Sequence, residues 1–399
     1  MSDAPWLTII GVGEDGRAGL GAASQSALDS ADVVMGPERH LDLIGDTKAK
    51  RIVWPVPFAD GLETLLSLRP QKVVVLASGD PFWFGAGSTI SRHLSEHEWM
   101  ALPNISTFAG VASRLGWALE STACLGLHAA PLQRLRPMLS QGSKAIVLLR
   151  DGKAVADLAD LLTTLGFGAS LLHSFEALGG GRERRTNFRA NAVPDTTFAH
   201  PVCVALTCEG DGSPIPKTAG IADEFFKTDG TMTKRPVRAL TLSALAPKPG
   251  EHLWDLGSGS GSIAIEWLLS DPSTSATAVE LRAERVQLSN ENALTLGVDR
   301  LKTVQGEIEA SLESLPPPDA VFIGGGLSET LLERLFDVLP SGVRLVVNAV
   351  TLEAEALLSI WHTQKGGSLM RIELARAEPL GSKRGWRASY PIVQWSVTT

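Results

Sequence analysis

Short apolar runs alternate with amphipathic stretches along most of the chain. In the first half the apolar runs lie at 7–10, 33–36, 72–77, 145–149 and 202–207. Their continuous hydrophobicity is typical of strands that are buried on both faces of a parallel sheet. Stretches with helical periodicity, such as 61–68 and 155–165, separate them. The pattern predicts an α/β fold with a mostly parallel sheet.

The pattern breaks once, between residues 209 and 220, where the chain is polar and rich in glycine and proline, as linkers are. We therefore predict one domain over 1–208, a linker over 209–220 and a second domain over 221–399. The halves show no mutual repeat, so we expect two different folds. Strands are predicted in the second domain at 252–256, 276–280, 301–305, 319–323, 343–347, 369–374 and 391–397.

The most informative motif follows the strand at 252–256. Gly257, Gly259 and Gly261 alternate there and lead into a helix. Glycines let a backbone approach a ligand closely, and a helix N-terminus offers free amide donors. Glu280 ends the next strand, where a carboxylate can accept both hydroxyls of a ribose. We predict a nucleotide-type cofactor site that includes Asp255, Gly257, Ser258, Gly259, Ser260, Gly261 and Glu280.

The spacing of the glycines indicates which cofactor this is. A dinucleotide fingerprint, G-x-G-x-x-G, would place its third glycine at Ser262. The observed G-x-G-x-G, with Asp255 two residues before it, resembles the first motif of the Rossmann-like (class I) methyltransferases. That resemblance implies S-adenosylmethionine as the cofactor.

A longer resemblance covers about 221–399. The segments Gly-Thr-Met-Thr-Lys (230–234), Leu-Trp-Asp-Leu-Gly-Ser-Gly-Ser-Gly-Ser (253–262), Phe-Ile-Gly-Gly-Gly (322–326) and Asn-Ala-Val-Thr-Leu-Glu (348–353) resemble decarboxylating precorrin methyltransferases of corrin biosynthesis. The resemblance implies that Gly306 packs against adenine, that Gly324 and Gly325 leave room for substrate and that Asn348 faces the reacting methyl. Thr233 either caps the following helix or contacts the methionine end of the cofactor.

The first half resembles the tetrapyrrole methylases in four segments: Gly-Val-Gly (11–13), Ser-Gly-Asp-Pro-Phe-Trp-Phe-Gly (78–85), Pro-Asn-Ile-Ser-Thr (103–107) and Ala-Ser-Arg-Leu-Gly-Trp (112–117). That family has two α/β lobes with S-adenosylmethionine between them. The implied cofactor residues are Gly11, Gly13, Gly79, Asp80, Pro81, Ser106 and Thr107. Glu14 departs from the family, which commonly has proline at this position.

Composition narrows the class of protein. The 399 residues carry a net charge of −8, which argues against general binding to nucleic acid or to a membrane surface. Cys124, Cys203 and Cys208 are an odd number at unrelated spacings, so we predict neither a disulfide framework nor a metal site. No apolar run reaches about 18 residues and no signal sequence is recognised, so we expect a cytoplasmic protein.

Two methyltransferase domains on one chain suggest two methylations of one substrate. The resemblance implies that precorrin-6Y becomes precorrin-8X: the second domain methylates meso position 15 and decarboxylates the ring C acetate, and the first methylates position 5. Each domain uses one S-adenosylmethionine and releases S-adenosylhomocysteine. The family's second domain tends to self-associate, so we expect a homo-oligomer.

Basic residues are the expected ligands of the substrate's many carboxylates. The candidates are Lys234, Arg235 and Arg238 in the second domain and Arg182, Arg184 and Arg185 in the first. We predict that Arg238 and Asn348 act closest to the reaction.

Two alternatives stay open at this stage. In the first, the chain is a methyltransferase of another acceptor, such as RNA or a small phenol. Alternatively, the first domain only docks or channels the substrate and catalyses nothing.

Overall fold

The computed structural model describes residues 5–399. The chain divides into two compact units. The first unit comprises residues up to 130 together with 140–213, and the second comprises 131–139 together with 214–399. Each unit is described separately below.

The first lobe of the first unit is built on a five-stranded parallel sheet with the order β3-β2-β4-β1-β5. Its strands are β1 (Leu7–Val12), β2 (Val33–Gly36), β3 (Lys50–Val53), β4 (Val73–Ser78) and β5 (Trp99–Leu102). The predicted runs at 7–10, 33–36 and 72–77 are strands. β3 and β5 were not predicted: β3 begins with Lys50 and Arg51 and is mostly exposed, and β5 is apolar but has only four residues, none of them fully buried.

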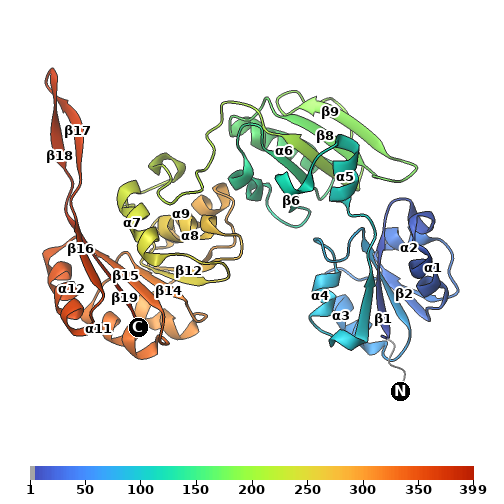
Figure 1. Cartoon of the computed structure of the whole chain (residues 1–399), viewed down its shortest axis with the longest axis horizontal. Coiled ribbons are helices and arrows are strands. Elements are labelled where there is room, and N and C mark those ends of the chain that lie inside the picture. The colour runs from blue at the N-terminus through green and yellow to red at the C-terminus, as the bar shows by residue number, and fades with distance from the viewer. Residues whose placement is uncertain (1–4) are drawn as a thin grey trace. The chain divides into compact units, whose positions relative to one another are not determined.

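Helices cover both faces of this sheet. They are α1 (Ala22–Asp29), α2 (Glu38–Ile44), α3 (Asp60–Ser67) and α4 (Gly87–Ser91). Leu28 of α1 and Leu41 of α2 share one core cluster, while Leu65 of α3 and Ile90 of α4 share the other. The two pairs of helices therefore lie on opposite faces (Figure 1).

The second lobe corrects the prediction of a mostly parallel sheet. Its strand order is β6-β7-β10-β8-β9, and only β6 and β7 pair in parallel. β8 and β9 form a hairpin, and β10 enters between β7 and β8, so three of the four pairings are antiparallel. The elements are α5 (Thr107–Leu115), β6 (Thr122–Gly126), β7 (Lys144–Leu148), α6 (Lys153–Thr164), β8 (Leu171–Glu176), β9 (Arg184–Arg189) and β10 (Val202–Thr207).

The second unit contains a seven-stranded sheet with the order β13-β12-β11-β14-β15-β19-β16. All seven predicted strands are confirmed, with ends that differ by one or two residues. They are β11 (His252–Leu256), β12 (Ser275–Glu280), β13 (Lys302–Gln305), β14 (Ala320–Ile323), β15 (Arg344–Ala349), β16 (Ser368–Ile372) and β19 (Ile392–Thr398). β19 runs antiparallel to both neighbours, β15 and β16.

Three helices pack on each face of that sheet. Cores on the two faces take side chains from α7, α8 and α9 on one side and from α10, α11 and α12 on the other. Successive residues of β11 contribute to different faces, Leu253 to the first and Trp254 to the second, as the pleat of a strand requires. The helices are α7 (Arg235–Leu245), α8 (Ser262–Ser270), α9 (Ala283–Thr295), α10 (Ile308–Ser311), α11 (Glu329–Val338) and α12 (Leu352–Lys365).

A hairpin between β16 and β19 was not predicted. β17 (Ala375–Leu380) and β18 (Lys383–Ala388) form a separate two-stranded sheet that projects from the second unit (Figure 1). Most of its residues are exposed, including Trp386. Without a buried face it has no alternation of apolar and polar residues, and so its sequence gives no strand signal.

Candidate cofactor and substrate sites

The glycine loop of the second unit lies at the carboxyl end of β11, where ligands bind in open α/β sheets. Gly257, Gly259 and Gly261 have φ angles of +71°, +56° and +76°. Side chains are disfavoured at such angles, which explains the three alternate glycines. A Cβ at Gly257 would lie 2.5 Å from the carbonyl oxygen of Gly325, and one at Gly261 would lie 2.2 Å from the Ser289 hydroxyl. A Cβ at Gly259 would meet nothing within 4 Å, so this position faces open space.

Two acidic side chains flank the loop. The Glu280 carboxylate accepts hydrogen bonds from the Gly259 and Arg282 amides at 2.9 and 3.0 Å, and it fixes the shape of the loop. Asp255 is buried, and its Oδ2 accepts from the Ala264 amide at 3.1 Å. Burial raises the pKa of Asp255 to about 7; the charge of Glu280 adds to this shift and the Ala264 hydrogen bond opposes it.

Polar atoms without a partner among the described residues gather here. They are Oδ1 of Asp255 and the hydroxyls of Ser258, Ser260 and Ser289. Buried polar atoms are normally hydrogen-bonded, so several such atoms around one loop indicate a site for a polar ligand. The donor set, the glycine cradle and the open space at Gly259 fit S-adenosylmethionine.

The other predicted glycines lie at the ends of neighbouring strands. Gly306 follows β13, and its amide donates to the Glu280 carbonyl at 3.0 Å. Gly324 follows β14, and its amide donates to the Leu256 carbonyl at 3.0 Å. A Cβ at Gly325 would lie 3.8 Å from the Gly257 carbonyl oxygen. The structure thus brings Gly306, Gly324 and Gly325 to the same sheet edge as the glycine loop.

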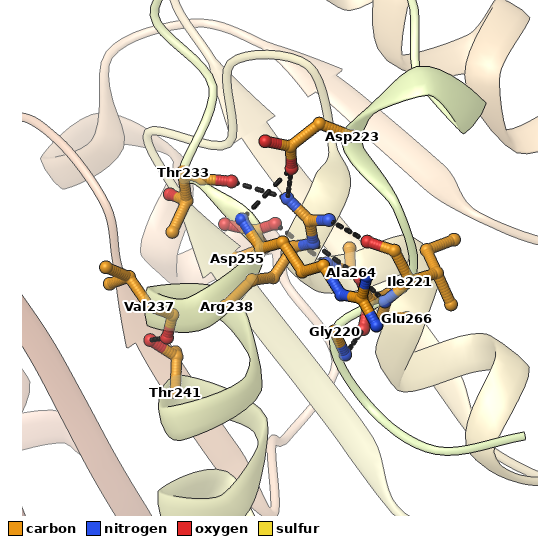
Figure 2. Close-up of polar contacts among 11 residues, drawn as sticks. Gly220, Ile221, Asp223, Thr233, Val237, Arg238, Thr241, Asp255, Ala264 and Glu266 are labelled. Carbon is orange, nitrogen blue, oxygen red and sulfur yellow. Dashed lines mark hydrogen bonds and ion pairs between the residues drawn. The ribbon is translucent and has the colours of Figure 1, made fainter. Parts of the chain in front are cut away.

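Arg238 lies in a different environment from the one expected for a substrate ligand. Its side chain has no exposed surface. Its guanidinium donates to the Glu266 carboxylate, to Asp223 at 3.0 Å, and to the carbonyls of Thr233 and Ile221 at 2.5 Å each (Figure 2). Because these protein groups accept the hydrogen bonds of its guanidinium, Arg238 is placed to hold the segment 220–233 against α8 rather than to bind a substrate carboxylate.

Asp223 and Glu266 complete this anchor. Glu266, on α8, also accepts from the Gly220 and Ile221 amides at 2.5 and 3.1 Å. Asp223 accepts from the Arg235 amide at 3.0 Å, so it satisfies a donor in the first turn of α7 (Figure 2). Neither carboxylate was predicted as a site residue, because the partners that give each its role lie far away in the sequence.

Thr233, Lys234 and Arg235 lie where this anchored segment enters α7. Lys234 occupies the N-cap position and Thr233 precedes it. The expectation that Thr233 caps this helix is therefore wrong. Thr233 is half-buried, and its carbonyl is held by Arg238. The side chains of Lys234 and Arg235 are exposed.

Asn348 belongs to a polar network near the carboxyl end of β15. Its amide donates to the Thr241 hydroxyl at 2.9 Å, and its Oδ1 accepts from the Gln394 amide at 2.9 Å. Gln394 also donates to the Thr241 hydroxyl at 3.1 Å. The network joins α7, β15 and β19. Thr241 and Gln394 were not identified from the sequence, because one lies in a helix and the other in a strand far along the chain.

We expect Gly259→Ala to weaken cofactor binding in the second unit by at least tenfold with only a modest loss of stability. The new methyl would enter the open space that the ligand needs, while a left-handed alanine costs about 1–2 kcal/mol. Calorimetric titration with S-adenosylmethionine measures the affinity. Gly250→Ala is the matched control, because Gly250 also has a positive φ and open space but precedes β11 at the other end of the sheet.

In the first unit the predicted cofactor residues gather at the carboxyl ends of β1, β4 and β5. A Cβ at Gly11 would lie 1.7 Å from the Gly79 carbonyl oxygen and 2.6 Å from the Asn104 amide nitrogen. The Gly79 amide donates to the Val12 carbonyl and the Asn104 amide to the Gly79 carbonyl, each at 3.0 Å. Gly11 is therefore needed for the close approach of three strand ends.

The remaining residues shape the loops around this point. Asp80 accepts from the Phe82 amide at 2.8 Å, which closes a turn after β4, and Pro81 is buried within it. Ser106 caps α5 through a hydrogen bond from the Ala109 amide at 3.1 Å, and Thr107 is the first residue of that helix. Gly13 lies just beyond β1, where a Cβ would meet the Asp15 carboxylate.

The arginines predicted for the first unit have different surroundings. Arg184 and Arg185 lie on β9 rather than in a loop. Arg184 forms a bidentate pair with the buried Glu176, both bonds measuring 2.8 Å, so its guanidinium is engaged in the sheet. Arg182 lies before β9, is largely exposed and approaches the Glu14 carboxylate to 3.6 Å.

None of the helices within residues 5–399 is long and apolar enough to cross a bilayer. Nor does this part of the chain bring together three histidine, cysteine or acidic side chains in an arrangement that holds a metal ion.

Comparison with known proteins follows the division of the chain. Residues 7–184 match the family described as tetrapyrrole (corrin/porphyrin) methylases, and residues 224–399 match the precorrin methyltransferase domain. A protein of Sinorhizobium sp named precorrin-6Y C(5,15)-methyltransferase [decarboxylating] is 46% identical over 99% of this chain and 97% of its own. A protein of the same name from Mycobacterium tuberculosis is 37% identical over 98% of this chain and 99% of its own.

A solved structure is also similar to part of the chain. The C-terminal domain of precorrin-6Y C5,15-methyltransferase from Rhodobacter capsulatus is 49% identical, with a TM-score of 0.45. The match covers 46% of this chain and all of that structure.

Proposed function

The chain belongs to the family of decarboxylating precorrin-6Y C(5,15)-methyltransferases, and from this premise we propose how its residues divide the reaction. The protein is a methyltransferase of cobalamin biosynthesis that uses S-adenosylmethionine, methylates precorrin-6Y at C5 and C15 and decarboxylates it. The alternative acceptors, RNA or a small phenol, have no support from these full-length relatives.

The second unit is proposed to methylate C15 and to decarboxylate the acetate of ring C. The observation that carries this proposal is the set of unpartnered buried polar atoms around the open glycine loop. Asp255 would accept a hydrogen bond from the cofactor, Glu280 would hold its ribose and Gly306 would lie beside its adenine. Gly324 and Gly325 leave space beside that position for a large planar substrate.

The first unit is proposed to bind a second S-adenosylmethionine and to methylate C5. Gly11, Gly13, Gly79, Asp80, Pro81, Ser106 and Thr107 lie at one edge of its first sheet. The turn closed by Asp80 and the close contact at Gly11 give this edge a defined shape. One cofactor in each unit follows from this proposal.

The reaction depends more on how the substrate and the cofactor are positioned than on reactive side chains of the protein. Bound S-adenosylmethionine would supply an electrophilic methyl group on a sulfonium, open to in-line attack by an electron-rich ring carbon, with S-adenosylhomocysteine as the leaving group. The residues of the chain orient the ring and keep water away, and orientation of this kind supplies much of the rate. The conjugated ring itself takes up the electrons released by decarboxylation.

Arg238 is proposed as a positioning residue that holds the segment carrying Thr233 over the cofactor site. Asn348 is proposed to line the substrate side of the same edge, with its amide oriented by Thr241 and Gln394. Lys234, Arg235 and Arg182 are the exposed cations proposed to bind substrate carboxylates. Arg184 is better placed to stabilise the β8–β9 hairpin through Glu176.

Paired variants test the division of labour. We expect Asp80→Ala to yield a product that gains one methyl and loses carbon dioxide, because only the first site is disabled. We expect Gly259→Ala to slow the C15 methylation and the decarboxylation. Mass spectrometry of the product from precorrin-6Y and S-adenosylmethionine distinguishes these results.

Asp80→Asn is the control for that experiment, because asparagine keeps the acceptor that closes the turn with Phe82 and removes only the charge. If Asp80→Ala still adds both methyls at the full rate, the first unit is a docking domain and our assignment of C5 methylation to it is wrong. Assembly into a homo-oligomer and location in the cytoplasm stay predictions from the sequence.

A further inference from the structure

A charged cluster of Glu14, Arg39 and Arg182 lies beside the proposed cofactor loop of the first unit. Of these three residues, only Arg182 was a predicted site residue. Glu14 follows β1, Arg39 lies in the first turn of α2 and Ser78 ends β4. All three positions are at the carboxyl ends of parallel strands, the edge at which open α/β sheets bind ligands. Ser78 directly precedes Gly79, so the cluster adjoins the Gly79–Pro81 turn.

Glu14 is the center of the cluster. Its side chain is only 8% exposed, and its carboxylate pairs closely with the Arg39 guanidinium. Arg182 approaches the same carboxylate to 3.6 Å from the second lobe of the unit. A Cβ on Gly180 would lie 2.7 Å from the Cβ of Glu14, so this glycine lets the β8–β9 connection close onto the loop after β1.

Besides Glu14, the polar partners of Arg39 are a histidine and a serine. Its Nη2 lies 2.8 Å from the His40 Nε2 and 3.4 Å from the Ser78 hydroxyl. Burial and then the charge of Arg39 lower the pKa of His40 to about 4, so this imidazole is neutral at pH 7. Burial and then Arg39 also lower the pKa of His200, and the charge of Asp151 opposes this shift. Burial and then Arg182 lower the pKa of Arg39 itself, which remains charged.

The charges in this cluster do not balance. Two guanidiniums share one carboxylate, and the two neighbouring histidines cannot supply a negative charge. Arg39 keeps 32% of its side chain exposed and Arg182 keeps 72%, so both can still reach a ligand. Guanidiniums bind carboxylates through paired hydrogen bonds. A second carboxylate would neutralise the excess charge.

We infer that Arg39 and Arg182, held by Glu14, form a carboxylate-binding subsite of the first unit. This inference rests on the proposed function: the carboxylate belongs to a side chain of the tetrapyrrole that is methylated at C5. Glu14 orients the two arginines and leaves their outer hydrogen-bond donors available. The subsite fixes the ring relative to the Gly79–Pro81 turn, and so it selects which meso carbon meets the methyl group.

The test uses opposite changes of charge in the full-length protein. We expect Arg39→Gln and Arg182→Gln each to raise the KM of precorrin-6Y for C5 methylation about 10-fold or more, since a hydrogen bond to a charged group contributes about 1.5–3 kcal/mol. Glu14→Gln removes the negative charge but keeps both cations and an amide oxygen that can still accept a hydrogen bond from Arg39, so the KM should stay the same or fall. A purely structural ion pair would give losses in the same direction for all three variants.

Further measurements separate the possible failures. Arg51→Gln, which removes an exposed arginine paired with Asp42 in the same lobe, is the control and should change nothing. Equilibrium binding of precorrin-6Y, followed by absorbance, should weaken in Arg39→Gln while the affinity for S-adenosylmethionine and the C15 methylation stay normal. Unchanged KM and binding in both arginine variants would overturn the inference. Failure of the unsubstituted protein to methylate C5 would instead overturn the proposed function.

If Arg39→Gln is too unstable to study, Arg182→Gln carries the test alone. Its side chain is largely exposed, so its replacement should leave the fold intact. A normal KM and normal precorrin-6Y binding in a folded Arg182→Gln protein would then contradict the subsite.

Discussion

Replacing Arg238 with leucine is expected to lower the free energy of unfolding of the second unit by about 3–5 kcal/mol, which is typical when one partner of a buried ion pair is removed. The change leaves the Glu266 carboxylate buried without its cation, since the exposed fractions of the two side chains are 0% and 2%. It also frees the carbonyls of Ile221 and Thr233 from their donor. Chemical denaturation followed by circular dichroism measures the loss.

Arg334→Leu is the matched control for this experiment. Arg334 pairs with Glu313 at 2.6 Å, but both side chains are exposed, so we expect a loss of at most about 1 kcal/mol. Arg238→Lys should recover little of the stability, because one ammonium group cannot reproduce the planar set of donors. If Arg238→Leu were as stable as the unsubstituted protein and only raised the KM for precorrin-6Y, Arg238 would be a substrate ligand after all.

Asp255→Asn is expected to stabilise the protein without ligand and to weaken its binding of S-adenosylmethionine. Burial raises the pKa of Asp255 from its ordinary value of 3.8 to about 7. Between these two values the unfolded chain is ionised while the folded chain stays protonated, so the free energy of unfolding falls as pH rises through this range. Asparagine does not titrate, and so the variant does not show this fall.

The stabilisation by Asp255→Asn should therefore be close to zero below pH 4, grow from pH 4 to 7 and stay constant above pH 7. Its upper limit is about 4 kcal/mol, because one pKa unit corresponds to about 1.4 kcal/mol. The free energy of unfolding, measured by denaturation at several pH values, tests the sign. A difference between the two proteins that is independent of pH would contradict it.

The loss of cofactor affinity in Asp255→Asn follows from the other carboxylate oxygen. Oδ1 of Asp255 has no partner among residues 5–399, although it is buried, so it is available to a donor of the cofactor. An amide nitrogen at that place would offer a donor instead of an acceptor. We expect the dissociation constant for S-adenosylmethionine to rise about 10- to 100-fold, from the contribution of a hydrogen bond to a charged group. Equal affinity in calorimetric titration would exclude this role for Oδ1.

The sequence predicted the second unit more fully than the first. Its strands at 252–256 and 343–347 are buried on both faces, and such strands are recognisable as mainly apolar runs, although Asp255 interrupts the first and Arg344 the second. In the first unit, β9 has the sequence Arg-Arg-Thr-Asn-Phe-Arg and is exposed at four of its six positions. A strand stabilised by pairing with β8 rather than by its own burial has no such signature, so its sequence does not predict a strand.

The glycine loop was predictable because its determinants are local. Gly257, Gly259 and Gly261 need positive φ angles, and the strand before them and the helix after them are contiguous in the chain. The polar network of Asn348 was not predictable, because Thr241 and Gln394 are 107 and 46 residues away from it in sequence. No spacing rule connects a helix position with two strand positions at those separations.

The sequence by itself determined the fold class, the glycine loop and the resemblance that assigns the chain to its family, since these depend on hydrophobic periodicity and on motifs within short segments. Only the tertiary structure decided which charged residues are free to meet a ligand. Arg238 and Arg182 were both predicted from the sequence as ligands of substrate carboxylates, yet the first has no exposed surface and the second is 72% exposed. The physical reason is that solvent exposure and ion pairing depend on partners distant in sequence, here Glu266 for Arg238 and Glu14 for Arg182.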